Sequence, residues 1–210
     1  MAMILIGQYD SPFVRRVGIA LTLYEIPFEH WPWSTFGDAD RIRPYNPLVR
    51  VPTLILDDGS VLIESHAILD YLDGLVPLGR ALFPRTEPER RIALKVAALA
   101  TGLGDKAVSL FYEKRLHEQA SDIWMERCRK QISGVLTVLE TDRSRISGDY
   151  WFGSRIGHSD IAVAVVLRFL SEVHPDLVQL VEYPALKSHA HRLEALPAFQ
   201  KVVQPFIPPA

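Results

Sequence analysis

Two serines of this chain lie where an expected helix begins, and a hydroxyl in that place can interact with an anion. Ser11 precedes Pro12 and an apolar repeat that predicts a helix over 12–24, so Ser11 is expected to be its N-cap. Ser65 precedes a second helical repeat and is expected to cap that helix. A helix N-terminus offers free N–H groups and a positive dipole end, so it can hold a carboxylate or phosphate.

A β-hairpin is expected to position the second of these helices. The apolar runs PTLIL and VLI are separated by Asp58-Gly59, which suits the two positive-φ positions of a type I′ turn. Pro52 begins the first strand, where a missing N–H is tolerated at a sheet edge. The pattern therefore predicts strand, turn, strand and helix, with the helix N-terminus just past the end of a strand.

The remaining elements fall into an α/β half and a helical half. The first half has expected strands at 3–8 and 26–31 and a short irregular helix within 33–45, which gives the order βαβαββα. After a connector over 76–88 that contains proline and glycine, only helical periods follow. These helices are expected at 89–117, 121–142, 158–173 and 184–196, with a short one from Pro197.

The stretch from Asn46 to Asp73 resembles a known family. NPLVRVPTL followed by DDGSVLIESHAILDYL is similar to the second half of the thioredoxin-like domain in glutathione transferases, and SPFVRRV from Ser11 resembles their serine-type motif S-P-F-x-x-R-V. The resemblance implies an α/β thioredoxin-like N-terminal domain and an all-α C-terminal domain. The expected limits are 1–77 for the first domain, 78–88 for the linker and 89–210 for the second domain.

The same resemblance gives Ser11 a catalytic role as hydrogen-bond donor to the sulfur of glutathione. A thiol with a pKa of about 8.5 is only a few per cent thiolate at neutral pH. A hydroxyl donor together with a helix N-terminus stabilises the reactive anion. Tyr9 is the alternative donor, because other members of the family use a tyrosine after the first strand. Its other expected place is in the acceptor pocket.

The rest of the glutathione site is implied by the family's motif. Val51 would pair with the cysteinyl part through its backbone, with a cis bond to Pro52, while Glu64 and Ser65 would bind the γ-glutamyl end. Arg50 would lie near the glycyl carboxylate or point into solvent. Phe13 is counted with the glutathione site and also as a candidate for the acceptor pocket.

The family places the acceptor pocket beside the first long helix. The candidates that this implies are Trp33, Leu103, Ala107, Leu110 and Phe111, most of which have an alternative reading as core residues. Asp105 on the same helix is a candidate to reach glutathione in the neighbouring subunit of a homodimer. The start of the helix over 158–173 departs from the family: Gly157 replaces the usual Ser or Thr, and Asp160 is expected to bond the exposed N–H groups.

Composition limits the other functions. The net charge of the 210 residues is −2, with no basic arm, which argues against nucleic acid as a partner. The longest apolar run near the end is too short to span a membrane, and no Cys/His cluster has zinc spacing. The single cysteine, Cys128, suits a reducing compartment, so a cytoplasmic protein is expected.

The expected activity is attack of glutathione thiolate on a small hydrophobic electrophile, as in detoxification, with glutathione as co-substrate. The alternatives are a glutathione-dependent isomerase or peroxidase, and a transferase-like module that binds glutathione or another ligand without turnover. The absence of a cysteine at position 11 argues against thiol–disulfide exchange.

Overall fold

The computed structural model describes residues 2–208, and the chain forms two compact units. Of the described residues, 2–82 and 196–208 form the first unit, and Phe83–Ala195 forms the second. The expected domain limits stay predictions. The closing segment nevertheless groups with the first unit, whereas the sequence placed it in the helical domain.

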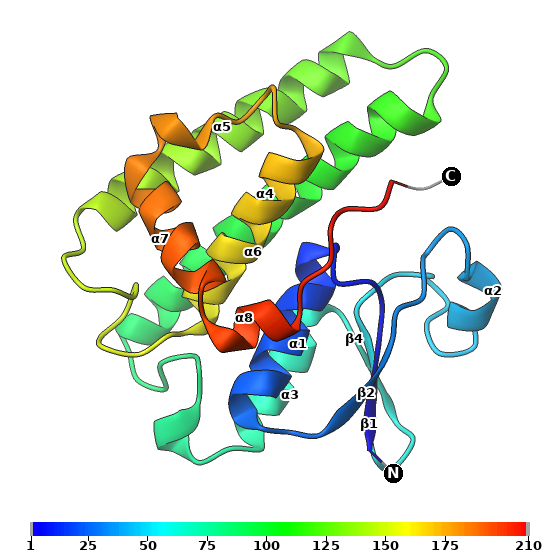
Figure 1. Ribbon diagram of the computed structural model, residues 1–210, viewed down its shortest axis with the longest axis vertical. Helices are drawn as coiled ribbons and strands as arrows, with labels where there is room; N and C mark the ends of the chain where they lie inside the picture. The colour runs from blue at the N-terminus through cyan, green and yellow to red at the C-terminus, as the bar shows by residue number, and fades with distance from the viewer. Residues whose placement is uncertain (1, 209–210) are drawn as a thin grey trace. The chain divides into compact units, whose positions relative to one another are not determined.

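A four-stranded mixed sheet is the centre of the first unit (Figure 1). Its order is β2-β1-β3-β4, with β1 parallel to β2 and antiparallel to β3, and β3 antiparallel to β4. The inner strands are apolar, and Leu5 and Leu54 are fully buried. The strands are β1 Met3–Ile6, β2 Phe28–Trp31, β3 Thr53–Ile55 and β4 Val61–Ile63.

Two helices of this unit, α1 and α3, pack against each other beside the sheet (Figure 1). Their buried faces come from aliphatic residues at helical spacing, including Val17, Leu21, Ile68 and Leu72. The short helix α8 contacts α1. The helical elements of the unit are α1 Pro12–Tyr24, α2 Ala39–Ile42, α3 Ser65–Gly74, the 3₁₀ turn Leu78–Arg80 and α8 Pro197–Lys201.

The hairpin turn differs from the expected type I′ form. Of its two central residues, Gly59 has a positive φ of 85° and Asp58 does not. The N–H of Leu56 donates to the carbonyl of Ser60, and the N–H of Gly59 donates to the carbonyl of Leu56. The loop therefore has three residues, 57–59, with the left-handed position at its end. The prediction of the hairpin is confirmed and that of its turn type is wrong, because one more aspartate joins the loop.

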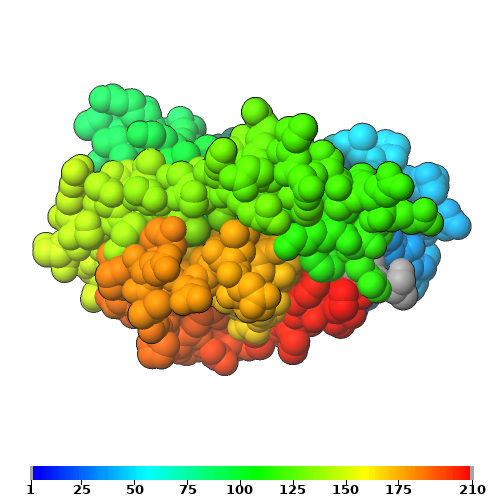
Figure 2. All heavy atoms as spheres, turned by 90° about the horizontal axis from the view of Figure 1, so that it is seen from above, coloured from blue at the N-terminus to red at the C-terminus, as the bar shows by residue number. Residues whose placement is uncertain are grey.

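The second unit contains helices only, apart from its connections. The longest helix, α4, packs against α5 and α6, and α7 packs against both α5 and α6. Figure 2 shows α7 (orange) lying along the C-terminal half of α5 (yellow-green) on one face. The helices are α4 Glu89–Leu116, α5 Asp122–Ser144, α6 His158–Val173, the 3₁₀ turn Leu180–Glu182 and α7 Pro184–Glu194. Within residues 2–208, no helix has both the length and the apolar character needed to cross a membrane.

Candidate functional site

Ser11 is the N-cap of α1, as the sequence predicted. Its Oγ accepts a hydrogen bond from the N–H of Val14 at 3.5 Å, which is long for such a bond, and its side chain is partly exposed. A capping serine uses its oxygen as acceptor, so the hydroxyl proton is still available for a second partner. Capping and donation to an anion are therefore compatible at this residue.

Tyr9 has a structural position between α1 and β2. Its ring stacks on His30 with the ring centroids 3.8 Å apart, and a Cβ added at Gly18 of α1 would lie 2.9 Å from the Tyr9 ring. Burial raises the pKa of the Tyr9 phenol to about 12, so the hydroxyl keeps its proton at neutral pH. The packing against His30 and Gly18 is enough to explain a tyrosine at position 9, without a catalytic role for its hydroxyl.

The loop before β3 is held in shape by Asn46, a residue whose role the sequence analysis missed. Its buried side-chain amide donates to the carbonyl of Arg50 at 2.9 Å and to the Thr53 hydroxyl at 3.1 Å. Its Oδ1 accepts from the N–H of Leu48 at 3.1 Å. The peptide bond between Val51 and Pro52 is cis. The loop thus presents a fixed backbone at Val51.

The start of α3 differs from the expected arrangement in one respect. Glu64 is the N-cap position, with φ 67° and ψ 121°, and Ser65 is the first helical residue. The prediction of Ser65 as N-cap is therefore wrong by one residue, and Glu64 makes no capping bond through its side chain. The hydroxyl of Ser65 instead accepts from the Arg16 guanidinium at 3.5 Å. A non-glycine residue at positive φ is strained, and such strain is concentrated at functional sites.

Arg50 and Glu64 form an ion pair across this region. Arg50 Nη1 lies 3.0 Å from Glu64 Oε1, with both side chains well exposed to water. Two residues assigned to opposite ends of glutathione are therefore in direct contact in the first unit.

Gly7 lies where the first turn of α1 and the loop at Val51 approach each other. It has φ 128°, and a Cβ added there would lie 2.5 Å from Val14 Cγ2 of α1 and 2.8 Å from the Cβ of Val51. The first turn of α1 and the loop at Val51 therefore meet at the end of β1. The contact between Arg16 and Ser65 adds the start of α3. Sequence analysis missed Gly7, although a glycine directly after a strand is a recognised signal of close backbone approach.

The expected acceptor-pocket residues occupy two environments. Trp33 stacks on Trp31 at 4.5 Å in the first unit, and the Arg41 guanidinium lies 4.2 Å from its ring centre. On α4 of the second unit, Leu103, Ala107 and Leu110 are buried and Phe111 is partly exposed. Asp105, the cross-subunit candidate on the same helix, is exposed. Phe13, at the second position of α1, is partly exposed.

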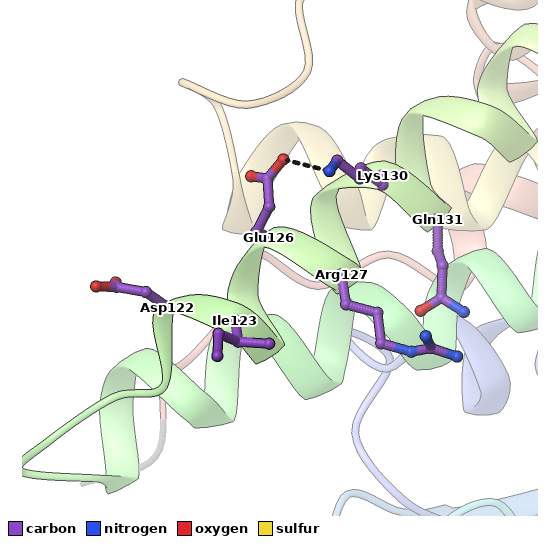
Figure 3. A pocket seen from close by; sticks show the side chains of 6 residues that line it. All are labelled: Asp122, Ile123, Glu126, Arg127, Lys130 and Gln131. Atoms are coloured by element: carbon purple, nitrogen blue, oxygen red, sulfur yellow. Dashed lines mark ion pairs between the residues drawn. The ribbon is translucent and has the colours of Figure 1, made fainter.

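A shallow hollow on the second unit involves none of these residues. It runs along the first turns of α5, lined by Asp122, Ile123, Glu126, Arg127, Lys130 and Gln131 (Figure 3). Glu126 and Lys130 form an ion pair at 3.5 Å on its rim, while Arg127 and Gln131 point away from that pair. Side chains from one helix that do not converge make a surface groove. Among residues 2–208, no three or more His, Cys, Asp or Glu side chains are grouped so that they could hold a metal ion.

Comparison with known proteins agrees with this architecture over both halves. The sequence model of the glutathione S-transferase N-terminal domain matches residues 5–80, and that of the C-terminal domain matches residues 122–192. An uncharacterized GST-like protein of Escherichia coli, YibF, is 34% identical over 137 residues, which are 65% of this chain and 67% of that protein. Rat maleylacetoacetate isomerase is 27% identical over 94% of this chain and 90% of its own.

Solved structures give the same result for the fold. A glutathione S-transferase from Methylobacterium radiotolerans, in complex with glutathione sulfonate, superposes with a TM-score of 0.89 at 30% identity over 100% of both chains. The thioredoxin-like unit with its mixed sheet and the helical unit after it are thus those of a glutathione transferase fold. Two domain models and a relative that is 34% identical over 137 residues show that this chain belongs to the glutathione S-transferase family.

Proposed function

We propose that this protein is an enzyme that binds glutathione in its first unit and activates the thiol for attack on a small hydrophobic electrophile. The observation that carries the proposal is the meeting of three segments there: the first turn of α1 behind Ser11, the loop at Val51, and the start of α3 at Ser65. The relative from Methylobacterium radiotolerans holds glutathione sulfonate on the same fold, which supports the choice of ligand.

Ser11 is proposed as the residue that stabilises the thiolate. Its hydroxyl proton is available beside the N-terminus of a 13-residue helix, so a bound sulfur anion would receive both a hydrogen bond and the favourable end of the helix dipole. A drop of about 2 units in the thiol pKa requires about 2.7 kcal/mol, which these two effects can supply together. Tyr9 is proposed as a structural residue, because its ring stacks on His30 and packs closely against Gly18.

The other proposed contacts with glutathione are those that the family's motif assigns. The backbone of Val51, before the cis bond to Pro52, would pair with the cysteinyl residue. Glu64 and Ser65 would take the γ-glutamyl end, with Arg50 and Phe13 at the edge of the site. Trp33 of the first unit is proposed to contact the acceptor. Of the α4 candidates, Phe111 is partly exposed, whereas Leu103, Ala107 and Leu110 are buried within the second unit.

Titration calorimetry with glutathione tests the first half of this proposal. Uptake of one glutathione per chain is expected, together with a new ultraviolet absorption of the thiolate at neutral pH. A panel of chlorinated aromatics, epoxides, peroxides and maleyl compounds then tests the reaction. Absence of glutathione uptake would refute the proposal, and uptake without turnover on any compound would favour a binding module.

A glutathione-dependent cis–trans isomerase is the second candidate. It is supported by the match to rat maleylacetoacetate isomerase over 94% of this chain. Isomerisation uses the same thiolate but regenerates glutathione, so a constant glutathione concentration during turnover of a maleyl compound distinguishes it from conjugation.

A cytoplasmic homodimer is part of the proposal. The only cysteine, Cys128, is free and buried, which suits a reducing compartment. Asp105, which is exposed on α4, is the candidate cross-subunit residue of such a dimer. Sedimentation at micromolar concentration measures the assembly.

A further inference from the structure

Arg16 is a buried cation with one weak partner. Its side chain is 2% exposed, and Nη1 donates to Ser65 Oγ at 3.5 Å. Nε is buried without a hydrogen-bond partner, and the part of the chain from 2 to 208 offers Arg16 no ion pair. A buried charge that lacks hydrogen bonds and a counter-charge is costly, so such groups are normally paired.

The adjacent arginine shows how this helix satisfies a buried guanidinium when the partners are internal. Arg15 is equally buried, but its Nε donates to the carbonyl of Val202 at 2.8 Å and its Nη2 to that of Phe199 at 3.3 Å. The Arg15 guanidinium also lies 5.6 Å from the centre of the Phe199 ring. Arg16 has no equivalent set among the described residues, although it is one position along the same helix.

Burial does not remove the charge of Arg16. Loss of water lowers its pKa to about 10, so the guanidinium is still a cation at neutral pH. The buried charge of Arg16 would therefore be stabilised by a nearby anion, and its Nε–H is a donor without a hydrogen-bond partner in the described part of the chain. Arg16 donates to Ser65, so we expect such an anion to lie near Ser65.

Ser65 is the first residue of α3, a ten-residue helix whose N-terminus carries free N–H groups. Two sources of positive charge therefore act on the same place, the helix end and the guanidinium. Because the Ser65 hydroxyl accepts from Arg16, its own proton is directed to another acceptor. A carboxylate, with no proton to donate, fits this arrangement of donors.

We propose that Arg16 is a positioning residue for the α-carboxylate of the γ-glutamyl residue of glutathione, holding the Ser65 hydroxyl as donor and supplying the cation behind the end of α3. This inference rests on the glutathione binding proposed above. According to this inference, the preference for a ligand with the α-carboxylate depends on Arg16, a buried residue of α1. It does not depend on a surface residue near α3.

A pair of ligands and a pair of variants test the assignment. The ligands are glutathione and γ-aminobutyryl-cysteinyl-glycine, which keeps the ammonium and the thiol but lacks the α-carboxylate. The variants are Arg16→Met, which removes the charge and keeps an unbranched apolar stem, and Arg15→Met, the matched change at the neighbouring buried arginine. Dissociation constants are measured by titration calorimetry for both ligands with each protein.

The unmodified protein and Arg15→Met are expected to bind the analogue about ten- to hundredfold more weakly than glutathione, the range of a charge-assisted hydrogen bond. Arg16→Met is expected to discriminate by about twofold or less, with a higher KM for glutathione and an unchanged kcat. Full discrimination in Arg16→Met would overturn the inference. If the unmodified protein binds no glutathione, the proposed function fails instead.

A measurement on the unmodified protein keeps the test decisive if Arg16→Met does not fold. In a spectrum of arginine labelled with nitrogen-15, the Nε–H signal of Arg16 is identified by its absence in Arg16→Lys. This signal is expected to shift on addition of glutathione and to stay in place with the analogue. An Arg16 signal that responds equally to both ligands would contradict the role given to this residue.

Discussion

Arg50 and Glu64 contact each other through an ion pair of 3.0 Å, which joins the loop at Val51 to the start of α3. Their side chains are 57% and 38% exposed, so the pair itself stabilises the fold by only about 0–1 kcal/mol. Glu64 is held at φ 67°, a conformation that residues other than glycine rarely adopt. A strained backbone beside a weak ion pair favours a ligand-binding role for the Glu64 carboxylate.

Glu64→Gln is expected to weaken glutathione binding about tenfold while changing the free energy of unfolding by less than about 1 kcal/mol. The reason is that the neutral amide loses the charged partner of the ligand's ammonium group and loses little from the exposed pair. Arg50→Gln is expected to cost about threefold or less. Titration calorimetry and urea unfolding give the two quantities.

The exposed ion pair between Arg80 and Glu25 at 3.1 Å supplies the control for that experiment. Glu25→Gln removes a comparable pair in the same unit and should leave glutathione affinity unchanged. Equal losses of affinity in Glu25→Gln and Glu64→Gln would contradict a specific role for Glu64.

Ser11→Ala is expected to lower kcat/KM for conjugation at least about tenfold and to raise the pKa of the bound glutathione thiol. The pKa is read from the thiolate absorbance as a function of pH. Tyr9→Phe is expected to cost less than Ser11→Ala, because phenylalanine keeps the ring that stacks on His30. A larger loss in Tyr9→Phe would reverse the assignment.

Loss of the cap is separated from loss of the thiolate donor by a second N-cap serine. Ser121 caps α5 with an N–H···O bond of 3.3 Å from Trp124. Ser121→Ala and Ser11→Ala are each expected to lower the free energy of unfolding by about 0.5–2 kcal/mol. Only Ser11→Ala is expected to change the thiol pKa.

The fold was predictable because its signals are local. The S-P start of α1, the Asp-Gly loop between β3 and β4, and the apolar periods of α4 and α6 all lie within a few residues of the elements that they specify. The motif around Val51 and Ser65 then gave the family, which the comparisons confirm.

The arrangement of the site was less predictable, because its contacts join residues distant in the chain. Arg15 is buried, and its guanidinium donates to backbone carbonyls that lie 184 and 187 positions away in the chain. Arg16 is buried against a residue 49 positions away. Periodicity reports which residues are apolar, and it cannot report that a charged one is covered by another segment.

Gly7→Ala is expected to destabilise the first unit by about 2–4 kcal/mol. The added methyl would meet Val14 at 2.5 Å and Val51 at 2.8 Å, and the backbone φ of 128° is one that L residues rarely adopt. Gly59→Ala is the matched control, since φ there is 85° but no described atom lies within 4 Å of the added Cβ. It should cost about 1–2 kcal/mol, the backbone penalty alone. Equal costs by urea unfolding would show that packing at Gly7 is unimportant.

The second unit contains a buried polar cluster that links its stability to pH. Asp160 at the start of α6 accepts from the N–H groups of Gly157 at 2.8 Å and Trp151 at 2.7 Å, which confirms its expected orientation. His189 Nε2 lies 3.5 Å from Asp160 Oδ1, and its Nδ1 accepts from Arg143 Nε at 3.2 Å. Burial first, and then the Arg143 charge, lowers the pKa of His189 to about 3, while burial raises that of Asp160 to about 6.

These two shifts act in opposite directions on the free energy of unfolding. Between pH 3 and 6.5 the unfolded chain protonates His189 and the folded chain does not, so this residue removes stability as the pH falls. Between pH 3.8 and 6 the folded chain protonates Asp160 and the unfolded chain does not, so this residue adds stability as the pH falls. The two contributions therefore offset each other over the window that they share.

His189→Gln is expected to expose the contribution of Asp160. Glutamine can still accept from Arg143 but does not titrate, so the variant should gain stability relative to the unmodified protein as the pH falls below 6.5. The gain is at most about 1.4 kcal/mol per pH unit, the value for one proton. Urea unfolding at a series of pH values measures it, with His191→Gln, an exposed residue of the same helix, as the control. Curves for His189→Gln and the unmodified protein that run parallel from pH 7 to 4 would mean that His189 carries no such linkage, and that Asp160 alone sets the response of this cluster to acid.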